Sequence, residues 1–195
     1  LLGLGGATAV AAYSIVANLA LIAVSVFTGI GQSVQPLLAR EQGTHKEANI
    51  RRLMGYALLL SLALGSFFLL LGWRFPGTLA TIFNRAGDVP LQQLAEQGIS
   101  RYFLSFLFMG INIVSIAAFS AVGRPLPAFV LSLLRSVVLI PPVLFLLSSI
   151  FGIGGIFSVI PCVEFSTLLP TCFLLHRRFF AKTQPRAEAS SPPRI

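Results

Sequence analysis

The first 39 residues of this 195-residue chain contain no charged side chain, and charged residues then follow together between Arg40 and Arg52. A helix of about 20 apolar residues already spans the roughly 30 Å hydrocarbon core of a bilayer. In water, a run of this length would have to be buried completely. The run therefore predicts a membrane-spanning segment.

The composition extends this prediction to the whole chain, which is 55% hydrophobic and only 10% charged, with a mean hydropathy of +0.86. Soluble domains carry about 25% charged residues. The net charge of +8 comes from residues between the apolar runs, and these residues do not interleave with aromatic side chains along one face. Such a pattern is typical of the loops of a membrane protein and excludes nucleic acid as a partner. The expected partner is the lipid bilayer.

Five apolar runs approach or exceed the spanning length, at residues 7–38, 53–73, 102–122, 128–148 and 154–175. Because the bilayer core offers no water to backbone groups, these runs must be helices. The first run would be about 48 Å long, so we expect it to tilt or to loosen near Gly29, Gly31 and Pro36. The prediction is an all-α, polytopic bundle over residues 1–180. A disordered, basic cytoplasmic tail is expected at residues 181–195.

The distribution of basic residues predicts the orientation. If the N-terminal end lies outside, ten Lys and Arg residues fall inside and only Arg74, Arg85 and Arg101 fall outside. Basic residues are enriched in cytoplasmic loops. We therefore expect the C-terminal tail in the cytoplasm. The chain opens without an initiator Met, on a Gly-rich stretch typical of a turn between helices, and this suggests a piece of a longer polytopic protein.

The sequence contains none of the common motifs of catalysis. The sequence has no phosphate-binding loop before a Lys, no nucleophile elbow and no pair of His at metal-binding spacing. Cys162 and Cys172 are about 15 Å apart along one predicted helix, too far for a disulfide. We expect no catalytic residue, no metal site and no cofactor, and hence no enzyme.

Polar residues recur along one face of the first predicted helix, namely Ser14, Asn18, Ser25, Thr28, Gln32 and Gln35. One interpretation is hydrogen bonding between helices, worth about 0.6 kcal/mol for each contact. The other is a water-filled cavity. The third predicted helix carries a similar face, with Ser105, Met109, Asn112 and Ser115, in which Asn112 lies near the bilayer midplane and serves either packing or function.

Glu164 is the most informative single residue. It stands about 15 Å into its helix, and a carboxylate at that depth is costly and usually faces a cavity or a partner. Arg135 lies about 10 Å into the preceding antiparallel helix, within side-chain reach. Glu164 is therefore either half of an ion pair with Arg135 or a site for a proton or another cation.

Several stretches resemble the multidrug and toxic compound extrusion (MATE) transporters. Residues 28–36, followed by Ala39 and Gly43, are similar to the cytoplasmic end of the second helix in each half of these proteins. The order and spacing of the family's last three helices are matched by Phe119, Gly123, Arg124, Ser132, Arg135, Pro141 and the run 152–157 to Pro161. The resemblance covers residues 1 to about 178.

This resemblance implies five transmembrane helices of a six-helix C-terminal lobe, helices eight to twelve of twelve. The partner would be the N-terminal lobe of the same polypeptide. The implied function is secondary-active antiport in a bacterial inner membrane, exporting organic cations or drugs in exchange for Na⁺ or H⁺, without a cofactor. In this reading an aromatic, polarisable surface for a cation is offered by Phe103, Phe106, Phe108, Met109 and Phe119.

Two features depart from the family pattern. Several members carry a carboxylate in helix ten, where this chain has Asn112, and the loop at residues 40–45 lacks the family's Asn-Tyr-Gly-Ala-like sequence. A flippase of lipid-linked sugars is the alternative transporter, but it would require several cations in its cavity, and only Arg135 lies inside a predicted helix. A non-transporting membrane scaffold is the other alternative, and it would scatter its polar residues.

Overall fold

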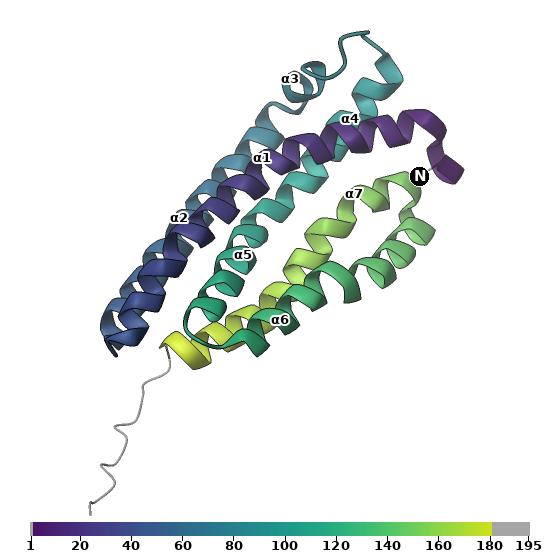
Figure 1. Cartoon of the computed structure of the whole chain (residues 1–195). Helices are drawn as coiled ribbons and strands as arrows, with labels where there is room; N and C mark the ends of the chain where they lie inside the picture. Colours follow the sequence, from purple (N-terminus) through teal and green to yellow (C-terminus); the bar gives the residue numbers. More distant parts are fainter. Residues whose placement is uncertain (1, 181–195) are drawn as a thin grey trace, which may run out of the picture.

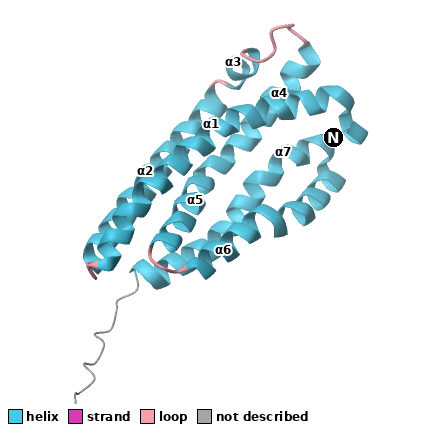
Figure 2. Ribbon diagram, in the orientation of Figure 1, coloured by secondary structure: helices cyan, strands magenta, loops and turns pink. Residues whose placement is uncertain are grey.

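A computed structural model describes residues 2–180, and the predicted tail at 181–195 lies outside the described residues. The described part consists of helices joined by short loops and contains no strand (Figure 2). The main helices are α1 (Leu2–Gly43), α2 (Glu47–Arg74), α3 (Pro76–Thr81), α4 (Val89–Tyr102), α5 (Phe106–Ala121), α6 (Pro125–Leu133) and α7 (Ile140–Leu175). A 3₁₀ turn, Phe103–Ser105, joins α4 to α5, and π-helical turns occur at Leu134–Val138 and His176–Phe180.

Within the described residues, four helical segments are long and apolar enough to cross a membrane: residues 6–43, 47–74, 89–121 and 125–180. The last contains 56 residues and would be about 84 Å long if straight. It is not straight, because Gly152 leaves the helical conformation with φ 58° and ψ −135°. Figure 1 shows α6 and the later part of α7 as the two arms of a hairpin. Each arm is long enough for one span, which confirms the all-α bundle and gives the five predicted crossings.

Of the two alternatives predicted for α1, a tilt or a loosening near its internal glycines and Pro36, the loosening was wrong. The helix runs unbroken through Gly29, Gly31 and Pro36, and its backbone departs from helical geometry at Gly6 instead, with φ 62°. Gly31 serves close packing, since a Cβ there would lie 3.1 Å from the Cβ of Ala117 on α5. The absence of a side chain at Gly31 therefore lets α1 and α5 approach each other without bending α1.

Helix α5 lies at the centre of the bundle, in contact with α1, α2, α6 and α7. Its apolar side chains divide between two buried clusters, one with Phe27 and Phe106 and one with Met54 and Phe119. This burial corrects the proposed surface for a cation. Phe103, Phe106, Met109 and Phe119 are all core residues, at most 4% exposed, and Phe108 packs against Phe165 with ring centroids 5.4 Å apart. A central helix has little surface left for a ligand.

Candidate functional site

Glu164 forms an ion pair inside the bundle. It lies on the second arm of α7 and is 2% exposed, and its Oε1 accepts a hydrogen bond from Arg135 Nε at 2.6 Å. Arg135 belongs to the π-helical turn Leu134–Val138 on the opposite arm of the hairpin, and its side chain is 20% exposed. The turn at Gly152 therefore brings together the two charges that the sequence placed within reach. Turns of π-helix are rare and often occur at functional sites.

Asn112 connects this pair to the central helix. Its Nδ2 donates to Glu164 Oε2 at 2.8 Å and to the Glu164 carbonyl oxygen at 3.0 Å. The side chain is fully buried, yet its Oδ1 has no hydrogen-bond partner among the described residues. A buried acceptor without a partner is unusual. Asn112 thus holds the carboxylate with one end of its amide and offers an unpaired oxygen with the other.

Tyr102 belongs to the surroundings of Glu164, and Tyr13 lies near Tyr102; neither was among the residues predicted from the sequence. Tyr102, which is buried, lies near enough to Glu164, Arg135 and Tyr13 to interact electrostatically with all three. Tyr13 stacks on Phe157, with ring centroids 6.0 Å apart. A phenol inside an apolar run needs a polar partner for its hydroxyl, and this signal could have identified them.

The other candidates on the central helix have different surroundings. Ser105 lies in the 3₁₀ turn, is fully buried, and its Oγ has no hydrogen-bond partner among the described residues. Met109 packs in the first core cluster. Ser115 donates to the carbonyl oxygen of Ile111 one turn earlier, at 2.6 Å. Ser105 and Asn112, two turns apart on one face, are therefore the two positions of this group with an unpaired buried oxygen.

The polar residues of α1 are not part of this cluster. Ser14, Asn18, Ser25 and Gln32 are exposed, and Thr28 and Gln35 are partly buried. Ser14 and Ser25 donate to carbonyl oxygens of their own helix, and within residues 2–180 only Gln35 of the six bonds to another helix, at 3.4 Å to the carbonyl oxygen of Ala117. We call these six residues together the α1 polar stripe. Amides facing lipid are unfavourable, so the stripe requires water or another protein surface.

Five helical crossings with a charged, hydrogen-bonded cluster buried between them define a multi-pass membrane protein of the helical-bundle class. The model of the MatE family matches residues 1–146, and the chain belongs to this family of transporters. The matched range includes Asn112 and Arg135 and ends before Glu164.

Two solved structures of the MATE transporter VcmN from Vibrio cholerae share the fold. A point mutant superposes with a TM-score of 0.78 at 22% identity, over 88% of this chain and 40% of that chain. The bent form gives a TM-score of 0.77 at the same identity and coverage. The chain therefore spans less than half the length of these transporters. No curated protein shows significant similarity to it.

Proposed function

We propose that this chain forms part of a secondary-active antiporter that exports organic cations or drugs in exchange for Na⁺ or H⁺. The supporting observation is the buried carboxylate of Glu164, held between Arg135 and Asn112 in the interior of the bundle. The rest of the polypeptide would supply the second lobe. Transporters of this kind alternate access by rocking one bundle against another around a site near the midplane.

The cluster has the parts of an exchangeable cation site. A proton or Na⁺ that reaches Glu164 competes with the Arg135 guanidinium for the carboxylate, which accepts from Arg135 at 2.6 Å. The unpaired Oδ1 of Asn112 lies on the amide that already contacts Oε2, and oxygen atoms are the ligands that hard cations prefer. Arg135, with a side chain 20% exposed, can turn away when the cation arrives. Binding would thereby change the contact between the two arms of the hairpin.

The α1 polar stripe supports a cleft for the exported molecule. Its four exposed members face away from the core of the described bundle, which is the surface that a second lobe would cover. An organic cation could find hydroxyl and amide oxygens there. A flippase for a lipid-linked pyrophosphate fits less well, because the charge of Arg135 is already balanced by Glu164. We place the protein in a bacterial inner membrane, with the C-terminal tail in the cytoplasm.

The test is gradient-driven efflux by the full-length transporter in vesicles, with Na⁺ and H⁺ gradients imposed separately. We expect Glu164→Gln to abolish the dependence on the coupling gradient. Glu96→Gln is the matched control, since Glu96 accepts a hydrogen bond from Gln92 on its own helix and should keep normal coupling. Asn112→Leu should weaken coupling by Na⁺ more than coupling by H⁺.

Normal yield and normal gradient dependence of Glu164→Gln would refute the assignment of this residue. Transport by the 195-residue chain alone would contradict the need for a second lobe, because a cleft between lobes requires both. No transport of any cation under either gradient, with the full-length protein folded, would favour a membrane scaffold.

A further inference from the structure

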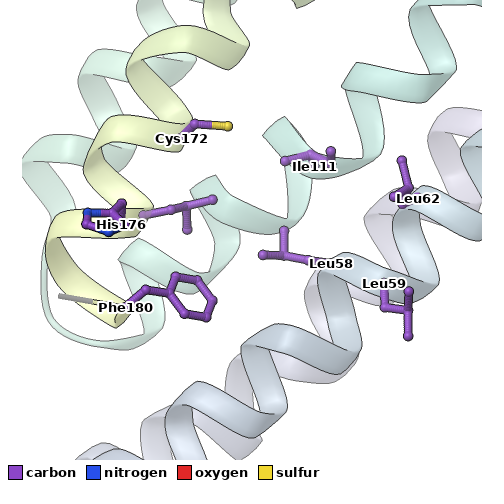
Figure 3. Close-up of a pocket in the computed structure, with 8 residues that line it drawn as sticks. Leu58, Leu59, Leu62, Ile111, Cys172, His176 and Phe180 are labelled. Carbon is purple, nitrogen blue, oxygen red and sulfur yellow. The ribbon is translucent and has the colours of Figure 1, made fainter. Parts of the chain in front are cut away.

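An apolar groove of about 430 Å³ runs between α2 and the last turns of α7. Figure 3 shows Leu58, Leu59 and Leu62 of α2 on one side, Cys172 and Phe180 on the other, and Ile111 of α5 between them. The groove contains none of the residues around Glu164 and none of the α1 polar stripe. It is a separate feature of the bundle.

The groove lies between two segments that could each cross a membrane. Its sides belong to the segments 47–74 and 125–180, which have the length and hydropathy of membrane spans. Leu59 is 64% exposed and Leu62 40% exposed, so apolar side chains line an unfilled space. Such a space between two spans suits a flexible, apolar occupant.

The end of the groove near the close of α7 is basic. His176 lines it, and the neighbouring Arg177 is exposed. On α2, no atom lies within 4 Å of the position of a Cβ at Gly55, about one turn before Leu58. Glu47, the nearby acid, is bound by Arg178 at 3.1 Å. The positive charge at this end is thus not cancelled by Glu47.

We propose that the groove binds one acyl chain of an anionic phospholipid, whose phosphate lies beside His176 and Arg177. The aliphatic lining matches the chain, and the basic end matches the headgroup. One Arg near an anionic headgroup contributes about 1 kcal/mol, so removing both side chains should lower the preference for an anionic over a zwitterionic lipid by about fivefold or more.

The binding of an anionic phospholipid in the groove is tested by quenching of Trp fluorescence with brominated lipids, in nanodiscs that hold the complete 195-residue chain. The chain has a single Trp, which is replaced by Trp73→Phe. Leu59→Trp then reports on the groove. Leu70→Trp is the matched control, because Leu70 lies on the same face of α2, is 62% exposed against 64% for Leu59, and does not line the groove.

We expect brominated phosphatidylglycerol to quench Leu59→Trp at about a fivefold lower mole fraction than brominated phosphatidylcholine. His176→Gln with Arg177→Gln should remove this preference, and Leu70→Trp should show none. Equal lipid preference at the two Trp positions would overturn the proposal. The proposal would also be overturned if neither lipid quenched Leu59→Trp while both quenched Leu70→Trp, since the groove would then hold protein.

Discussion

Gly65 provides a sharp test of the packing between α2 and α5. A Cβ at this position would lie 2.5 Å from the carbonyl oxygen of Phe106 and 3.2 Å from the Cα of Leu107, whereas ordinary contacts begin at 3.4 Å. The obstacle is backbone, so no side chain can rotate away. In Gly65→Ala the two helices must separate by about 1 Å, and overpacking of this kind costs about 1–3 kcal/mol.

Gly55, on the same helix, is a control at which Ala should not lower the free energy of unfolding. No atom lies within 4 Å of a Cβ at Gly55, and Ala is favoured over Gly in a helix by up to about 1 kcal/mol. We therefore expect Gly55→Ala to be neutral or stabilising and Gly65→Ala to be destabilising. Titration of the purified chain with SDS in mixed micelles measures both free energies of unfolding. Equal midpoints for the two variants would refute the close approach of α2 and α5.

Three further predictions concern the charges, the turn and the topology. Arg135→Gln should lower the free energy of unfolding by about 3–5 kcal/mol, because it leaves the buried Glu164 carboxylate unpaired. Glu164→Gln should cost less, because the Arg135 side chain is 20% exposed, and the double variant should recover much of the loss; simple additivity in SDS titrations would contradict the ion pair. Gly152→Ala should cost about 1–3 kcal/mol, since its backbone conformation is almost exclusive to Gly, whereas Gly29→Ala, with open space around it, should not lower the SDS midpoint. With Cys162 and Cys172 replaced, Ala86→Cys should react with an impermeant thiol reagent outside intact cells and Thr44→Cys should not; the reverse labelling would invert the proposed orientation.

The spans could be predicted from the sequence because insertion into a bilayer depends on local composition. A run of about 20 apolar residues is sufficient, and no distant contact changes that free energy much. The same reasoning found Glu164, since a carboxylate within such a run stands out without any knowledge of the fold. Its pairing with Arg135 was within reach because two consecutive antiparallel helices have an almost fixed register.

The roles of the remaining candidates depended on tertiary structure. Helical periodicity groups Ser105, Met109 and Asn112 on one face, but only the packing of α5 between its neighbours shows Met109 in the core and Asn112 against Glu164. Periodicity likewise described the α1 polar stripe without showing that it points away from the bundle.

The division between sequence and structure has a physical reason. The sequence by itself determined that the chain enters a membrane as helices and carries a buried acid, since both follow from the transfer of single segments out of water. The tertiary structure decided which helix faces meet, because those contacts depend on small residues such as Gly31 and Gly65, on the reversal at Gly152, and on a hydrogen bond between residues 52 positions apart. Helices in lipid gain little from burying one apolar face rather than another, and hydrophobicity therefore could not make that choice.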